Sequence, residues 1–73
     1  MTLDFTVKGD YIELIGLLKA LNLASSGGEA KMLVDDGIVY LNGTQEFRRR
    51  AKVKPGDKVE LQTDDEKFII QIK

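Results

Sequence analysis

The stretch SGGEAKMLVDDGIVYLNG, residues 26–43, decides the fold of this chain. Ser26 followed three positions later by Glu29 has the pattern of a capping box, which predicts a helix beginning at Ser26. Apolar residues then recur at helical spacing. Gly37 is expected to adopt the left-handed conformation that ends such a helix. The apolar run 38–41 predicts a strand, and Asn42-Gly43 is the strongest short signal for a hairpin turn.

Upstream of this stretch, apolar and polar residues alternate over 3–8, which predicts a short half-buried strand. A broad apolar face over residues 10–21 then predicts a first helix, with Asp10 and Glu13 as its capping box. We expect Asn22 to end this helix.

Downstream, Pro55-Gly56-Asp57 predicts a turn, and the alternation over 58–63 predicts a strand with Val59 and Leu61 facing inward. Asp64-Asp65 predicts a turn into a last strand, in which Phe68, Ile70 and Ile72 share one face. The pattern predicts an α+β fold: two helices packed on one face of a small, mostly antiparallel sheet. We expect one domain over residues 1–73.

Composition argues against several classes of function. The chain has no cysteine and no histidine, which argues against disulfides, a transition-metal site and histidine-based acid–base catalysis. The first residues lack the basic and apolar regions of a secretory signal, and the longest apolar run is residues 38–41. We therefore expect a cytoplasmic monomer without membrane association, metal, cofactor or small-molecule substrate.

Positive charge is concentrated in one segment, because residues 45–58 hold six of the eleven Lys and Arg but only two of the twelve Asp and Glu. If the segment is extended, four cations point one way, spaced about 6.6–6.8 Å apart like phosphates along a nucleic-acid strand. These cations are Arg48, Arg50, Lys52 and Lys54. Phe47, Ala51 and Val53 would face the other way, with Arg49 reaching outward from a turn or edge. The competing interpretation is a solvated, charged edge that discourages aggregation.

The start of the second helix is another candidate anion site. A helix N-terminus presents unpaired N–H groups, and Gly27 and Gly28 carry no side chains that would keep a phosphate away. Lys31, about one turn on, would add a charge. A plain capped helix start is the competing interpretation. The stretch lacks the lysine-serine ending of a nucleotide P-loop, which argues against nucleotide binding.

Two aromatic residues flank the hairpin, and either is a candidate for stacking on an unpaired base. We expect Phe47 in the core and leave Tyr40 open between core and stacking. Asp35-Asp36 is interpreted as a turn former. No nucleophile stands beside a base in sequence, so an enzyme is disfavoured.

The run from Leu17 to Asp57 resembles the RNA-binding domain named after ribosomal small-subunit protein four, also called the alpha-L motif. The matching elements are Leu17-Leu18, Leu23, Ser26, Glu29-Ala30-Lys31, Leu33-Val34, Gly37, Val39, Asn42-Gly43 and Gly56-Asp57. The run 26–31 together with Arg48-Arg49 resembles the small stand-alone bacterial subgroup typified by YbcJ. The resemblance implies an RNA contact by the second helix and the hairpin that follows it. Gly27 stands where many members have arginine, and Arg50 where the subgroup often has glycine.

The leading hypothesis is binding of structured RNA, ribosomal or transfer RNA, through phosphate contacts, in a ribosome-associated role. The candidate RNA-binding residues are Ser26, Gly27, Gly28, Lys31, Asn42, Gly43, Arg48, Arg49, Arg50, Lys52 and Lys54. We expect the basic segment and the Ser26 turn to converge in one electropositive cleft. The alternatives are a ribosome-associated protein–protein module, a double-stranded DNA binder and, least favoured, a small enzyme.

Overall fold

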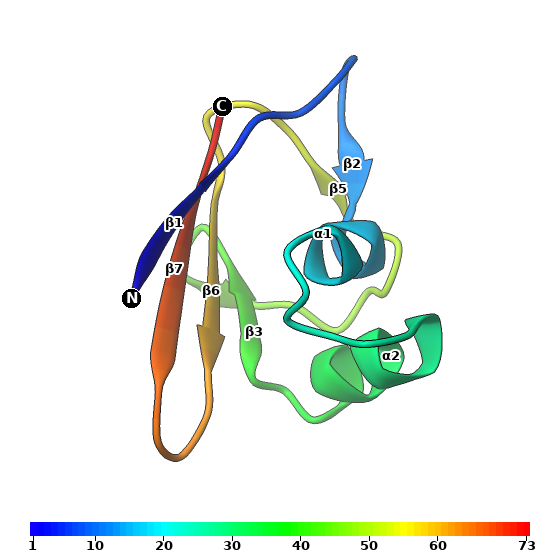
Figure 1. Cartoon of the computed structure of the whole chain (residues 1–73), viewed down its shortest axis with the longest axis vertical. Helices are drawn as coiled ribbons and strands as arrows, with labels where there is room; N and C mark the ends of the chain where they lie inside the picture. Colours follow the sequence, from blue (N-terminus) through cyan, green and yellow to red (C-terminus); the bar gives the residue numbers. More distant parts are fainter.

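The computed structural model describes all 73 residues as two helices and seven strands (Figure 1). In chain order the elements are β1 (Thr2–Phe5), β2 (Ile12–Glu13), α1 (Leu14–Ala20), α2 (Gly27–Asp35), β3 (Val39–Leu41), β4 (Thr44–Gln45), β5 (Lys52–Val53), β6 (Lys58–Gln62) and β7 (Lys67–Ile72). Neither helix is long or apolar enough to cross a lipid bilayer.

Five strands form one sheet in the order β1-β7-β6-β3-β4, and β2 and β5 form a separate two-stranded sheet. Only β1 runs parallel to its neighbour β7, while every other pair is antiparallel. The predicted α+β class with a mostly antiparallel sheet is therefore confirmed. Both termini lie toward the β1–β7 side, away from α2 (Figure 1).

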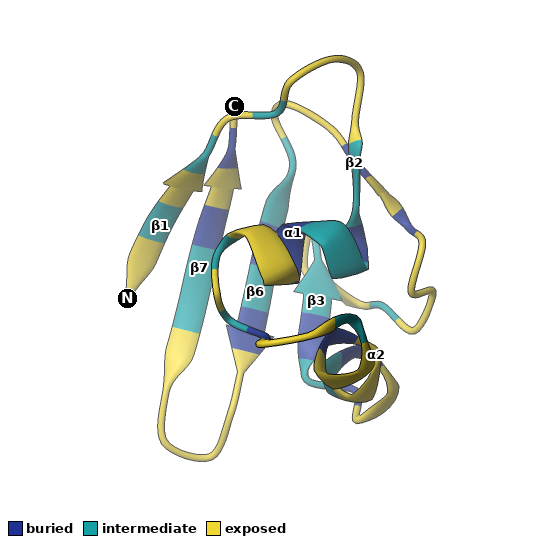
Figure 2. Cartoon of the chain, turned by 45° about the vertical axis from the view of Figure 1, so that its right-hand side comes forward, coloured by how far each residue is buried: buried dark blue, intermediate teal, exposed yellow.

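The core lies between the helices and one face of the larger sheet (Figure 2). Val59, Leu61, Ile70 and Ile72 are buried, as the alternation in β6 and β7 predicts, and Phe68 is half-buried beside them. Thirteen apolar residues form one continuous cluster, to which α1 contributes Leu14, Leu17 and Leu18. The helices are thereby fixed to the sheet by apolar packing.

The predicted start of the first helix at Asp10 is wrong. Helix α1 begins at Leu14, and no side chain caps it. Ile12 and Glu13 are instead paired with β5, and the Leu14 N–H donates to the Ala51 carbonyl at 2.9 Å. Backbone carbonyls of the basic segment thus accept hydrogen bonds from the first N–H groups of α1. The pairing of β2 with β5 takes the place of the predicted side-chain cap. Asn22 follows the helix in the left-handed region, at φ 58°, as expected of a stop.

The second helix and the hairpin follow the sequence closely. The Ser26 hydroxyl accepts from the Glu29 N–H at 3.1 Å, while the Glu29 carboxylate accepts from the Ser25 hydroxyl rather than closing the predicted box. Gly37 has φ +76° after the helix. Asn42 and Gly43 have φ 52° and 85°, the two positive values that a type I′ turn requires.

Candidate nucleic-acid interface

The basic segment leaves the main sheet after β4. Arg48, Arg49 and Arg50 are not extended as predicted, because a turn closed by the Ala51 N–H and the Arg48 carbonyl (3.1 Å) bends the chain. From Ala51 onward the predicted alternation holds. Ala51 and Val53 are buried, whereas Lys52 and Lys54 are exposed.

Despite this turn, the four cations of the predicted row border one open hollow of about 530 Å³. We call it the basic hollow, and its lining is Arg48, Arg50, Ala51, Lys52 and Lys54. Arg50, Lys52 and Lys54 form no ion pair with any carboxylate of the chain. Their charges are therefore available to an anion from outside.

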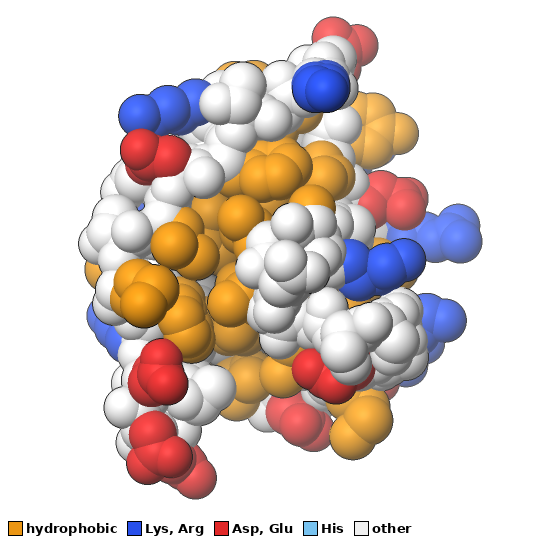
Figure 3. All heavy atoms as spheres, in the orientation of Figure 1, with side chains coloured by type: hydrophobic (Ala, Val, Ile, Leu, Met, Phe, Trp, Pro, Cys, Tyr) orange, Lys and Arg blue, Asp and Glu red, His pale blue; other side chains and the backbone are white.

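A second hollow of about 800 Å³ lies between α2 and the arginine turn. We call it the helix-side hollow, and its lining is Ile15, Gly27, Lys31, Asp35, Phe47, Arg49 and Arg50. Arg50 lines both hollows, so the start of α2 and the basic segment share one continuous surface. Lys and Arg side chains project from the right-hand side of Figure 3, the side on which the helices lie. The two predicted elements thus converge, and they do not lie on opposite sides.

The first turn of α2 keeps room for a ligand. The N–H groups of Gly27 and Gly28 have no acceptor within the protein. A Cβ built at Gly27 would meet nothing within 4 Å, so the fold itself does not demand glycine there. This room is what the close approach of a phosphate to the backbone would need. The Ser26 hydroxyl, by contrast, is occupied as the helix cap.

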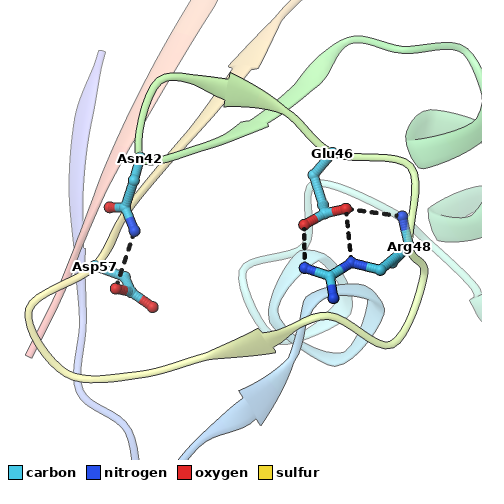
Figure 4. A network of polar contacts seen from close by, with 4 residues as sticks. All are labelled: Asn42, Glu46, Arg48 and Asp57. Carbon is cyan, nitrogen blue, oxygen red and sulfur yellow. Dashed lines mark hydrogen bonds and ion pairs between the residues drawn. The ribbon is translucent and has the colours of Figure 1, made fainter.

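Two of the arginines are held by carboxylates. The Arg48 guanidinium donates to both Glu46 oxygens at 3.2 and 3.0 Å (Figure 4), and Arg49 donates to both Asp35 oxygens at 3.1 and 2.6 Å. These hydrogen bonds hold the pKa of Asp35 and of Glu46 below the usual carboxyl range. Asp35, interpreted from sequence as a turn former, instead orients Arg49.

Asn42 and Gly43 are accounted for by the turn that they form. The Asn42 side-chain amide donates to Asp57 Oδ1 at 3.1 Å (Figure 4) and its carbonyl oxygen accepts from the Lys58 N–H at 2.8 Å. Both ends of the Asn42 side chain therefore join the hairpin to the start of β6. Neither residue lines the two hollows.

The expectation that Phe47 is a core residue is wrong. Its side chain is 55% exposed and lines the helix-side hollow, because the chain leaves the sheet after Glu46 and places the ring over Gly37. Tyr40 is half-buried opposite Glu60 in the β3–β6 register and lines neither hollow. Its neighbours Val39 and Leu41 pack on the core side.

The sequence analysis did not place Ile15 or Asp35 on this surface, and it did not identify Glu46 as the partner of Arg48. Glu46 stands two positions from Arg48, a spacing that places both side chains on one side of an extended chain. This spacing could have predicted the ion pair between them. Asp35 is separated from Arg49 by 14 residues, and no local pattern joins them. Elsewhere, acidic side chains do not gather in groups suited to a metal ion.

The fold and this surface define a small α+β domain in which a helix start and a cation-rich turn lie side by side. The model of the S4 domain family matches residues 5–71, and the chain belongs to this family.

Two curated relatives carry the name YbcJ. The chain is 36% identical over 52 residues to the "Putative RNA-binding protein YbcJ" of Escherichia coli strain K12, covering 71% of this chain and 74% of that protein. The same figures hold for the "Uncharacterized protein YbcJ" of Shigella flexneri. The solution structure of a tyrosyl-tRNA synthetase C-terminal domain shares the fold, with a TM-score of 0.70 over 100% of this chain and 79% of that one, at 18% identity.

Proposed function

We propose that this chain binds structured RNA, ribosomal or transfer RNA, in association with the ribosome, and that it acts as a binding module without catalysis. One observation carries the proposal. Arg50 lines both the basic hollow and the helix-side hollow, so that the cations and the free N–H groups of α2 border one surface. The S4 family membership and the printed name of the Escherichia coli relative support the same ligand class.

The chemistry of the surface suits phosphates rather than bases. Arg50, Lys52 and Lys54 are exposed cations that form no ion pair within the protein, and such groups position a nucleic acid without specifying its sequence. Lys31 and the Gly27 and Gly28 N–H groups would take a further phosphate at the helix start. Recognition would follow the shape and backbone of a folded RNA.

The salt dependence of binding tests this mechanism. If about four or five cations each neutralise a phosphate, log affinity falls against log salt concentration with a slope of about −3 to −4. Fluorescence anisotropy with labelled transfer RNA, and with a ribosomal RNA hairpin, between about 50 and 200 mM KCl measures that slope. A slope near zero would contradict a phosphate-based interface, and tighter binding to DNA of equal length would contradict the choice of RNA.

The carboxylate partner of Arg49 is expected to weaken RNA binding. Asp35→Asn releases the Arg49 guanidinium and removes one negative charge from the helix-side hollow. We expect affinity for transfer RNA at neutral pH to rise about two- to fivefold, a modest gain because the ion pair is exposed to solvent. Asp36→Asn is the matched control, since it makes the same change of charge at the neighbouring residue, which forms no ion pair. Equal gains in affinity from the two variants would show that only the total charge matters, and not the pair with Arg49.

The lowered pKa values of Asp35 and Glu46 determine how the RNA affinity of the protein depends on pH. A carboxyl whose folded pKa lies below its ordinary value stabilises the fold above that ordinary value, and the contribution is lost as pH falls through the lowered pKa. Asp35 and Glu46 therefore stay ionised near neutrality, and the chain has no histidine. RNA affinity of the unchanged protein should be flat from about pH 6 to 8.

A further inference from the structure

Tyr11 is an exposed aromatic residue next to the basic hollow. It stands immediately before β2, and 44% of its surface is exposed. The Lys52 ammonium lies 5.0 Å from the centre of the Tyr11 ring, within the range of a cation–π contact. The phenol hydroxyl has no hydrogen-bond partner in the protein. Nothing in the proposed phosphate surface uses this ring.

The Tyr11 ring borders a third hollow, of about 330 Å³. We call it the aromatic hollow, and its lining is Phe5, Thr6, Lys8, Tyr11 and Ile12. Its volume lies at the lower end of the range of about 300–1,000 Å³ that is usual for small-molecule sites. An apolar floor with a cation at the rim suits a planar, uncharged ring attached to an anion.

Lys52 connects the aromatic hollow to the basic hollow. Its side chain lines the basic hollow, while its ammonium group lies against the Tyr11 ring. A phosphate held at Lys52 would therefore bring the attached nucleoside next to Tyr11. Two carboxylates lie nearby: Asp10 precedes Tyr11 in the sequence, and Glu13 is the register partner of Lys52 in the β2–β5 pair. Neither lines the aromatic hollow, and neither forms an ion pair with Lys8 or Lys52.

We propose that the aromatic hollow accepts an unpaired base of the bound RNA, which stacks on Tyr11 while its phosphate contacts Lys52. The inference rests on the proposed RNA-binding function and extends it from phosphate contacts to a preference for RNA with a bulged or terminal unpaired nucleotide. Stacking tolerates any base, because every base has a flat face, so the preference concerns an unpaired position and not a sequence.

Two hairpin RNAs test the proposal, each closed by a non-nucleotide linker so that the loop offers no unpaired base. One is fully paired and the other carries a single bulged 2-aminopurine nucleotide. We expect the protein to bind the bulged RNA about tenfold more tightly, within the range measured for base–aromatic stacking, and to quench the 2-aminopurine fluorescence. Tyr11→Leu should remove both the preference and the quenching, so that the bulged and the paired hairpin bind equally. Tyr11→Phe should retain both, since the ring is kept.

The control variant is Tyr40→Leu, which removes a tyrosine from the outer face of the main sheet and should keep the preference. Circular dichroism establishes that each variant is folded. Equal binding of the two hairpins, or a preference that survives Tyr11→Leu, would overturn the stacking site while the proposed function stands. Absence of binding to either hairpin would overturn the proposed function, and the stacking site with it.

Discussion

Replacing Arg48 and Arg50 together by glutamate is expected to weaken binding to transfer RNA by about 100-fold or more. Both side chains line the basic hollow, and Arg50 also borders the start of α2. The double variant turns two cations into two anions on the surface that would meet phosphates. A hydrogen bond to a charged group is worth about 1.5–3 kcal/mol, so two lost contacts exceed a factor of about 100 before repulsion is counted.

The fold should survive this change, because both arginine side chains are exposed and Arg48 is 78% accessible. The Glu46 side chain, which loses its partner, is only 13% accessible, so circular dichroism is needed to establish that the double variant is folded. The matched control is Lys67→Glu in β7 together with Lys73→Glu just after it. It makes the same change in total charge at the β1–β7 edge of the sheet, distant from the helices (Figure 1). The site assignment fails if the Arg48 and Arg50 variant keeps its affinity, or if the control loses as much.

Elements whose pattern is set by burial against a sheet could be predicted from the sequence. The alternation over β6 and β7 and the signals at Ser26, Gly37 and Asn42-Gly43 correspond to the observed elements, because each depends on residues close in the chain. The start of α1 could not be predicted in this way. Its first N–H groups are satisfied by Ala51 and Arg49, residues that approach only after the whole chain has folded.

In the candidate site, too, features set by residues close in the chain could be predicted, whereas contacts between distant residues could not. Charge concentration and the glycines at the helix start identified the cations and the N–H groups that border the two hollows. The partners of those cations depend on where the arginine turn places them. Asp35 reaches Arg49 only because the turn at Arg48 to Ala51 brings the segment back over the end of α2. Phe47 is exposed for the same reason.

Leu17→Ala is expected to cause the largest loss of stability among these variants. Leu17 is fully buried in α1, and emptying such a site costs about 2–5 kcal/mol. A domain of this length has a total stability of about 4–11 kcal/mol, so the variant should lose a large part of it. The melting temperature, followed by circular dichroism, should fall by about 10 °C or more. Met32→Ala on the exposed side of α2, where Met32 is 64% accessible, should change it little.

Binding of RNA is expected to raise the melting temperature of Leu17→Ala, which links its stability to the proposed function. Since a ligand that binds only the folded state stabilises it by about 2.7 kcal/mol at 100 times its Kd, transfer RNA should restore much of the melting temperature of Leu17→Ala. The restoration requires the cations of the basic hollow, because RNA stabilises the fold only by binding the folded surface that they form. In a Leu17→Ala variant that also carries Arg48→Glu and Arg50→Glu, the same RNA concentration should restore only about 0.4 kcal/mol or less, because binding is about 100-fold weaker. A larger restoration in that triple variant would mean that RNA stabilises the fold through another surface.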